Sequence, residues 1–188
     1  MVEPRRCSWP LGPGAELRPL AATDLAELHA LIEANRVHLA AWLPWAAGQT
    51  AADTRDFLAS VGRQADANDG FQAAVLRDGA IAGVCGYVGV DWANRTTAIG
   101  YWLAADRQGR GLMTAAVAAL ARHALEVWGL RRVEVRAAVG NRRSRAVPER
   151  LGFEAEATFR RAQQIDGRAH DLVVYSRLAG DGALHRTS

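Results

Sequence analysis

The chain has 188 residues and a formal net charge of +3, with 49% hydrophobic and 23% charged residues. This length and composition predict a single globular domain and exclude an intrinsically disordered, collagen-like or coiled-coil chain as the main description. No apolar run approaches the roughly 20 residues that span a bilayer, and residues 1–14 lack the apolar core of a secretory signal. We therefore expect a cytoplasmic protein with no membrane partner.

The basic residues and the cysteines exclude several kinds of site. All 23 basic residues are arginine, and the chain contains no lysine. A P-loop phosphate site and a pyridoxal phosphate Schiff base both need a lysine, so these two classes of enzyme are excluded. The two cysteines, Cys7 and Cys85, form neither a disulfide framework nor a zinc pattern, and no metal site is expected. Cys85 lies in an apolar stretch and is expected in the core.

The apolar periodicity and the turn residues predict the elements in chain order. Residues 1–14 contain three prolines and two glycines and are expected to form a loose lead-in. Pro44 stops any helix in the segment 37–45. Strands are predicted at 16–20, 71–77, 81–90, 97–103, 132–139, 154–165 and 170–178. Helices are predicted at 23–35 (with Thr23 as N-cap), 50–66, 112–128 and 144–151.

The order of these elements predicts an α/β (α+β) fold with one mixed sheet and helices on both faces. The strand 97–103, the helix after it and the strand 132–139 form a right-handed crossover, so these two strands should be parallel. The hairpins make the remaining strands antiparallel. We expect one domain over residues 14–178, with tails at 1–13 and 179–188.

The loop at residues 104–111 connects a predicted strand to a predicted helix. The first N–H groups of a helix have no internal partner, and the helix dipole makes this end positive. Gly109 and Gly111 let an anion approach the backbone closely, while Arg107 and Arg110 add charge. The loop is therefore a candidate phosphate-binding site, the alternative being an ordinary strand-to-helix turn. It is not a Rossmann fingerprint, because the G-x-G-x-x-G spacing is absent.

Two segments resemble those of a known family. The stretch IGYWLAADRQGRGLMTAAV resembles the acyl-CoA-binding motif Q/R-x-x-G-x-G/A of the GNAT N-acetyltransferase superfamily, with Gln108 and Gly111 matching and Met113 where Gly or Ala is usual. The stretch NRRSRAVPERLGF, residues 141–153, resembles the second segment, N-x-x-S-x-x-V-x-E-R-x-G-F. The resemblance covers residues 14–178. NRVHLAAWLPW and the Asp-Gly hairpin make it most like the RimL-type ribosomal-protein acetyltransferases.

This resemblance implies a GNAT fold, in which a mostly antiparallel sheet is splayed between two parallel strands. It also implies an enzyme that transfers an acetyl group from acetyl-CoA to a primary amine by direct attack, with coenzyme A as product. The cofactor is expected where strands 97–103 and 132–139 separate. The residues expected to bind it are Trp102, Leu103, Ala104, Gln108, Gly109, Arg110, Gly111, Leu112, Met113, Thr114, Asn141, Ser144 and Arg145.

Ser144 resembles the family serine that protonates the departing thiolate, and we expect it to be catalytic. The alternative is that Ser144 is only the N-cap of the predicted helix 144–151. Many superfamily members carry a tyrosine acid one helical turn later, where this chain has Pro148. The loss of this tyrosine makes Ser144, or a water, the remaining proton donor.

The general base is less well defined by the resemblance. In ribosomal-protein-serine acetyltransferases a glutamate stands where this chain has Gln163, and a glutamine cannot accept the proton. Glu134, on a central strand, is the candidate base that we carry forward, with an outward-facing polar residue as the alternative. His170, Asp171 and a water are further candidates.

The acceptor site is expected to be flanked by the aromatic segment near the start of the chain. Trp42, Trp45 and Gln163 are expected to contact the acceptor, and His38 lies in the same segment as the tryptophans. The alternative is that the tryptophans pack a capping loop and that His38 is a surface residue.

Six arginines lie close together in the sequence: Arg131, Arg132, Arg136, Arg142, Arg143 and Arg145. No aromatic interleaving or nucleic-acid motif accompanies them, so no nucleic-acid partner is expected. A solvated face is one interpretation, and capture of the cofactor phosphates is the functional one.

The preferred acceptor is a protein N-terminal amine of the ribosomal-protein type. One alternative is a small amine such as an antibiotic or a polyamine, which acidic residues in the acceptor pocket would favour. A second alternative is a non-catalytic acyl-CoA-binding module. A homodimer is also expected, because homodimers are common in the family.

Overall fold

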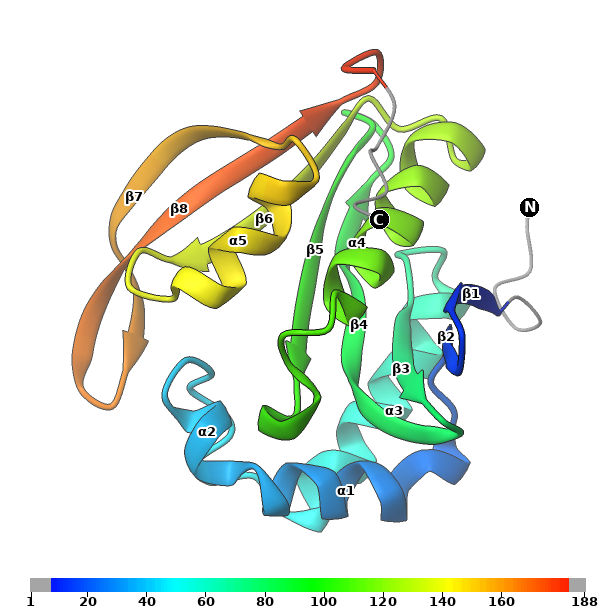
Figure 1. Cartoon of the computed structure of the whole chain (residues 1–188), viewed down its shortest axis with the longest axis vertical. Coiled ribbons are helices and arrows are strands. Elements are labelled where there is room, and N and C mark those ends of the chain that lie inside the picture. Colours follow the sequence, from blue (N-terminus) through cyan, green and yellow to red (C-terminus); the bar gives the residue numbers. More distant parts are fainter. Residues whose placement is uncertain (1–7, 183–188) are drawn as a thin grey trace.

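The computed structural model describes residues 8–182, so Cys7 lies outside the described residues (Figure 1). The strands are β1 (Trp9–Gly12), β2 (Ala15–Pro19), β3 (Gln72–Arg77), β4 (Ala80–Asp91), β5 (Thr96–Leu103), β6 (Arg132–Ala138), β7 (Glu154–Ile165) and β8 (Arg168–Leu178). The helices are α1 (Leu25–Ala34), α2 (Arg36–Ala40), α3 (Ala51–Asp66), α4 (Leu112–Arg122) and α5 (Arg142–Arg150). No helix within residues 8–182 is long and apolar enough to cross a membrane.

Over the described residues the strands form one sheet in the order β1-β2-β3-β4-β5-β6-β8-β7. The neighbours β5 and β6 are parallel, while the other neighbouring pairs are antiparallel. These pairings confirm the predicted mixed sheet and the crossover through α4, which arise because a long helix returns the chain to the same edge of β5.

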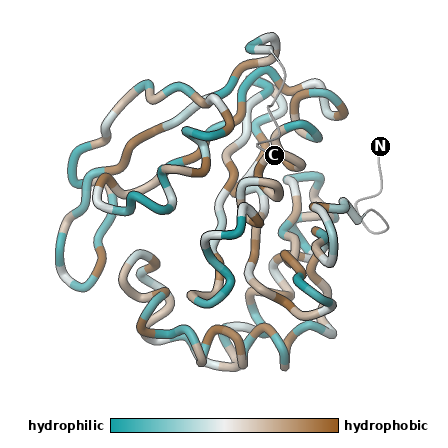
Figure 2. The backbone as a smooth tube through the Cα atoms, viewed as in Figure 1, coloured by the Kyte–Doolittle hydropathy of each residue, from teal (hydrophilic) through white to brown (hydrophobic). Residues whose placement is uncertain are grey.

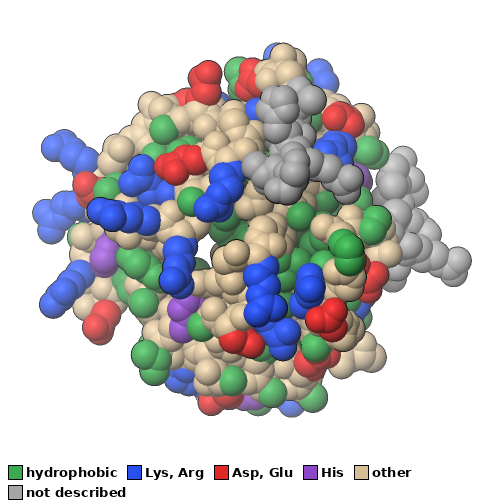
Figure 3. Space-filling model, in the orientation of Figure 1, with side chains coloured by type: hydrophobic (Ala, Val, Ile, Leu, Met, Phe, Trp, Pro, Cys, Tyr) green, Lys and Arg blue, Asp and Glu red, His purple; other side chains and the backbone are tan. Residues whose placement is uncertain are grey.

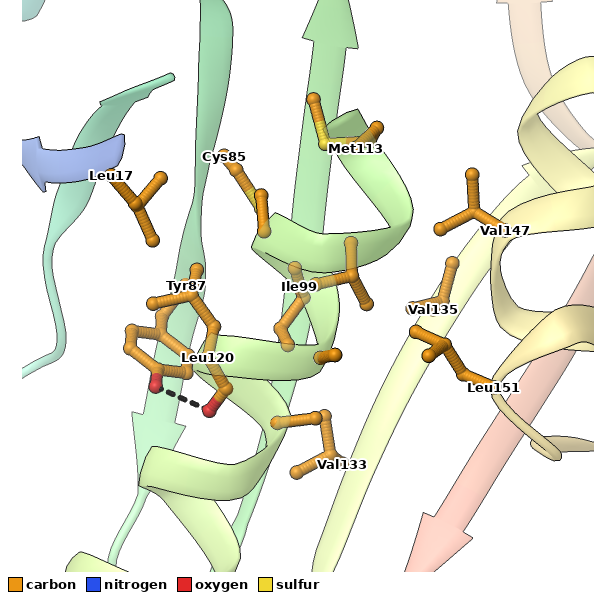
Figure 4. Packing of buried hydrophobic residues seen from close by; sticks show 14 of the residues in the cluster. Leu17, Cys85, Tyr87, Ile99, Met113, Leu120, Val133, Val135, Val147 and Leu151 are labelled. Carbon is orange, nitrogen blue, oxygen red and sulfur yellow. Dashed lines mark hydrogen bonds between the residues drawn. The ribbon is translucent and has the colours of Figure 1, made fainter. Parts of the chain in front are cut away.

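Two hydrophobic clusters hold helices against opposite faces of the sheet. On one face, Leu28 of α1 and Leu58 of α3 pack over Leu76 and Val84 of β3 and β4. On the other face, α4 and α5 pack over the central strands (Figure 4), and the phenol of Tyr87 donates a hydrogen bond of 2.8 Å to the Leu120 carbonyl. Apolar residues accordingly follow the central strands, whereas the β7–β8 turn is hydrophilic (Figure 2). Helices cover both faces, as predicted.

The feature that creates the site is the separation of β5 from β6. Their pairing begins at Thr96 with Arg132 and ends at Ile99 with Val135. Beyond that point β5 stays paired with β4, and β6 stays paired with β8 as far as Ala138. The sheet therefore opens between two strands that each remain anchored on their outer side.

The amino-terminal part differs from the sequence prediction in two ways. Within the expected lead-in, residues 9–12 form β1, because Trp9 stacks on Phe71 with ring centroids 5.5 Å apart and leads the chain into an antiparallel pair with β2. The prediction of Thr23 as N-cap is wrong, since a 3-10 turn at Ala22–Asp24 precedes α1. The helix start is set by Asp24, whose carboxylate accepts a hydrogen bond from the Ala21 N–H.

The helix predicted at 112–128 is α-helical at first and π-helical near its end. It is α-helical as α4 and then continues as a π-helical turn, His123–Val127, before Gly129 reverses the chain at a φ of 64°. His123 packs there against Trp9, Phe71 and Trp128. Cys85 is buried within the same cluster as α4, as the sequence predicts.

Gly83→Ala tests how closely β4 and β5 approach each other. A methyl group at this position would overlap the Trp102 carbonyl oxygen and lie 2.9 Å from Leu103 Cα, so the strands must shift. We expect urea unfolding to show a loss of about 1–3 kcal/mol in the free energy of unfolding. The control is Gly62→Ala, at an exposed position in α3 with no atom within 4 Å. We expect the control to gain about 0.5–1 kcal/mol, and equal stability of the two variants would contradict this account.

Candidate active site

A cleft of about 1120 Å³ lies where β5 and β6 separate. Its walls come from α2, the end of β5, the loop 104–111, the start of α4, the end of β6, α5 and β7. Figure 3 shows a hollow in this face of the molecule with basic side chains, all of them arginines, around it. Four arginines line the cleft: Arg136, Arg142, Arg143 and Arg150. Among the described residues that line it, none is aspartate or glutamate.

The loop before α4 has the geometry of an anion cradle. Gly109 and Gly111 have φ angles of 78° and 71°, in the left-handed region that glycine adopts without strain. A Cβ built at either position would meet no atom within 4 Å, so open space lies beside the backbone here. The N-terminus of α4 follows directly, and its first N–H groups carry the positive end of the helix dipole.

Gln108 connects the two sides of this cleft. Its carboxamide oxygen accepts a hydrogen bond of 2.8 Å from Arg143 on α5, and its carboxamide nitrogen lies 2.9 Å from Nε2 of His38 on α2. Asn35 adds a second link, since its side-chain oxygen accepts from the Ala105 N–H. These contacts fix the loop between two elements that lie far apart in the sequence.

The amino-terminal end of α5 carries the serine singled out in the sequence. Asn141 is the N-cap, and its side chain accepts a hydrogen bond of 3.1 Å from the Ser144 N–H. Ser144 as the N-cap is therefore wrong, because the helix begins two residues earlier than predicted. The phenol of Tyr101 donates to the Ser144 carbonyl at 2.8 Å, and the Ser144 hydroxyl donates to that phenol at 3.4 Å.

Tyr101 is a cleft residue that the sequence analysis missed. Burial raises the pKa of its phenol above the ordinary value, so the hydroxyl stays protonated and remains a hydrogen-bond donor. Tyr101 and Trp102 are consecutive residues of β5, so their side chains point to opposite faces of the sheet. From the sequence alone, Tyr101 looks like a strand residue that faces the core. The signal available in the sequence was that Tyr101 lies in the last part of the strand predicted at 97–103, where the cofactor is expected.

The structure brings most of the predicted cofactor residues together. The following line the cleft: Trp102, Leu103, Gln108, Gly109, Gly111, Leu112, Met113, Thr114, Asn141 and Ser144. Met113 is largely buried and packs in the core as well (Figure 4).

Three predicted cofactor residues do not line the cleft. Ala104 is fully buried and donates its N–H to the Ala82 carbonyl. Arg110 does not belong to the cleft lining. Arg145 points elsewhere, because its guanidinium donates to the Tyr175 hydroxyl at 2.8 Å and to the Val139 carbonyl. Position along the sequence could not separate Arg145 from Arg143, which lies on the cleft side of the same helix.

The structure does not bring the candidate base Glu134 into this cleft. Its side chain points into a smaller groove lined by β4, β5 and β6, where Arg132 and Arg136 both donate to it. Burial by itself would raise the pKa of Glu134, but the two guanidinium groups outweigh burial and hold the pKa below its ordinary value. His170 and Asp171 do not line the cleft either, and Asp171 accepts a hydrogen bond from the Arg161 N–H.

On the acceptor side, Trp42, Gln163 and His38 line the cleft. Trp45 does not, and its ring instead packs edge-on against Trp102 with centroids 6.3 Å apart. The loop that carries both tryptophans is fixed by Arg36, whose guanidinium donates to the carbonyl oxygens of Ala46, Ala47 and Gln49.

Comparison with known proteins gives the family. A family model described as acetyltransferase (GNAT) domain matches residues 15–154. The chain belongs to the GNAT acetyltransferase family. The putative ribosomal N-acetyltransferase YdaF of Bacillus subtilis strain 168 is 41% identical over 165 residues, 86% of this chain and 90% of that protein. The ribosomal-protein-serine acetyltransferase of Escherichia coli K12 is 27% identical over 164 residues, 87% of this chain and 92% of that protein.

Solved structures of GNAT enzymes share the whole architecture. RimL, the ribosomal L7/L12 alpha-N-protein acetyltransferase, in complex with coenzyme A, superposes with a TM-score of 0.88 at 26% identity, covering 93% of this chain and 100% of that one. The microcin C7 self-immunity acetyltransferase MccE, solved with acetyl-CoA and AMP, gives a TM-score of 0.84 at 27% identity, covering 89% and 94%. This GNAT enzyme is accordingly an acetyl-CoA-dependent N-acetyltransferase, and the predicted RimL-type resemblance is confirmed.

The cleft of this GNAT enzyme fits that donor. The open space beside Gly109 and Gly111 leaves room for phosphates at a helix N-terminus, and Arg143 supplies a permanent positive charge next to it. Beyond Ile99, the side of β5 that faces β6 has no strand partner within the described chain, so its backbone is free to pair with an extended ligand. No carboxylate of the described lining opposes the negative charge of the phosphates.

Arg143→Ala should weaken coenzyme A binding, because this guanidinium lies beside the phosphate loop. We expect the dissociation constant measured by calorimetry to rise at least about 10-fold, which corresponds to about 1.4 kcal/mol. Arg145→Ala is the matched control from the same helix, and we expect it to leave coenzyme A affinity within about 2-fold, or roughly 0.4 kcal/mol. The assignment fails if the two variants lose affinity equally.

The variants Asn141→Ala and Ser144→Ala test which of the two residues caps α5. Removing the Asn141 side chain leaves the Ser144 N–H without its acceptor, so we expect the free energy of unfolding to fall by about 1 kcal/mol. Asn141→Asp keeps a capping oxygen and should restore most of that loss. Ser144→Ala should be nearly neutral in urea unfolding, and a larger loss for it than for Asn141→Ala would place the cap at Ser144 after all.

Proposed function

We propose that this enzyme acetylates the N-terminal amine of a protein of the ribosomal type. Two relatives that span most of the chain are named for ribosomal acceptors, and RimL, which shares the fold, is described as an alpha-N-protein acetyltransferase. The cytoplasmic location and the homodimer expected from the sequence are part of this proposal.

The charge of the cleft lining supports a protein N-terminus over a polycation as the acceptor. Antibiotic and polyamine acceptors are polycations, and a site for them needs carboxylates. The described lining contains four arginines and no carboxylate, so it offers no partner to the additional ammonium groups of a polycation. A protein N-terminus brings a single positive charge on an otherwise neutral backbone, which this cleft can accept at a smaller electrostatic penalty.

The residues divide the chemical tasks as follows. The backbone of β5 beyond Ile99 positions the donor and offers N–H groups to the oxyanion that forms at the reacting carbonyl. The Ser144 hydroxyl supplies a proton to the leaving sulfur, and Tyr101 holds Ser144 in place through the Ser144 carbonyl. Trp42 and Gln163 contact the acceptor chain from α2 and β7.

A panel of acceptors tests the proposal directly. The enzyme is mixed with acetyl-CoA and with peptides that carry a free α-amine and no lysine, with the same peptides blocked at the N-terminus, with spermidine and with an aminoglycoside. We expect thiol release with the free peptides at a kcat/KM at least about 10-fold above that for either polycation, and mass spectrometry should locate the acetyl group on the α-amine.

Three outcomes would contradict the proposal. Faster turnover of spermidine or the aminoglycoside would assign a small-amine acceptor. Turnover of the blocked peptides would show that the α-amine is not the acceptor. Coenzyme A binding without turnover of any amine would assign an acyl-CoA-binding module.

A further inference from the structure

The cleft contains few groups that can accept a proton from the acceptor. Gln163 is an amide, the four arginines stay protonated, and the candidate carboxylate of Glu134 lies in the smaller groove between its two arginines. Imidazole is the side chain whose ordinary pKa lies between the pH values at which enzymes work. Among the described residues that line the cleft, one is a histidine, His38.

The hydrogen bonds around Gln108 fix the form in which this histidine is held. A guanidinium can only donate, so Arg143 identifies the atom of Gln108 that it contacts as the carboxamide oxygen. The other arm of the carboxamide, which faces His38, is then the NH2 group, which can only donate. Nε2 of His38 must therefore be the acceptor, with no proton on it and with its lone pair directed toward Gln108.

We propose that His38 is the general base that takes the proton from the acceptor amine. The carboxamide N–H of Gln108 occupies the position from which an amine N–H would donate to Nε2. When the acceptor displaces the Gln108 N–H from that position, while Asn35 still holds the loop, an ammonium proton moves to Nε2 and leaves a neutral amine. The amine lone pair forms the C–N bond while the C–S bond breaks and its electron pair leaves with sulfur. The Ser144 hydroxyl gives its proton to that sulfur and takes up the second amine proton, so the products are the amide and the free thiol. The imidazolium then returns its proton to water.

The groups that face His38 suit this role. Apart from His38, the titratable side chains of the described cleft lining are the four arginines and Tyr101. Burial raises the pKa of the Tyr101 phenol, so this group stays neutral. On the helical side, Glu33 is paired with Arg36, and in the neighbouring loop Asp106 is paired with Arg107. Within the described residues, His38 bonds the carboxamide of Gln108 and no carboxylate. No carboxylate of the described residues therefore competes with the acceptor for Nε2.

This inference rests on acetyl transfer to an amine, and it applies to any amine acceptor that the enzyme turns over. The test uses a peptide acceptor and His38→Gln, which keeps a polar side chain opposite Gln108. At pH 7 we expect kcat to fall about 10²-fold, with the KM for acetyl-CoA unchanged. The deficit should shrink as pH rises past the amine pKa of about 8, because the acceptor is then already neutral and needs no base.

Two further variants separate a base from a merely structural residue. His38→Ala should recover rate when imidazole is added to the solution, since free imidazole can enter the vacated space and accept the proton. Gln163→Glu in the His38→Gln background should restore part of the rate at pH 7, because it places a carboxylate in the same cleft lining. His29→Gln is the matched control: His29 bonds Thr54 outside the cleft and should keep a wild-type pH profile.

The outcomes distinguish this inference from the proposed function. If His38→Gln retains wild-type kcat at pH 7, or if its deficit is the same at every pH and imidazole fails to rescue His38→Ala, then His38 is not the base. If the wild-type enzyme turns over no amine at all, the proposed function fails first.

Discussion

The separation of β5 from β6 is the constraint on which the rest of the site depends. The strands pair over four positions and then diverge, yet each keeps its outer partner, so the gap is held open by the sheet itself. Closing it would require β5 to leave β4, where Gly83 already brings the two backbones into close contact. The cleft is therefore as rigid as the sheet, and the donor can be held by backbone groups that are in place before it binds.

The charged side chains are also divided between the cleft and the rest of the sheet. Arginines line the cleft, and three described carboxylates outside its lining are paired: Glu134 binds Arg132 and Arg136, Glu156 binds Arg132, and Glu149 accepts from Tyr175. Burial would raise the pKa of Glu134, but its two arginines keep it ionised, whereas Glu156 is held at a pKa of about 2 by Arg132 and Ser176. Of the arginines that line the cleft, Arg136 is thus held by Glu134, whereas Arg143 bonds the uncharged carboxamide of Gln108 beside the phosphate loop.

The sequence was sufficient for the fold and for the position of the glycine loop before α4. The crossover and the glycine loop follow from patterns within short stretches of the chain, and each lies where the sequence predicts it. The helix cap at α5 could not be predicted, because Asn141 and Ser144 are both good capping residues and the register of a short helix decides between them. The direction in which Arg145 and Glu134 point could not be predicted either, since it depends on strand and helix partners that are distant in the sequence.

The use of arginine at every cationic position has a consequence for the enzyme's own chemistry. A lysine at Arg136 or Arg143 would bring a primary amine, the group that the reaction consumes, into the lining of the cleft that binds the activated thioester. Guanidinium groups keep their charge and are poor nucleophiles at any pH that the protein survives. With no lysine anywhere in the chain, the catalyst offers no ε-amine to its own donor, so its cleft can stay loaded without the enzyme acetylating its own side chains.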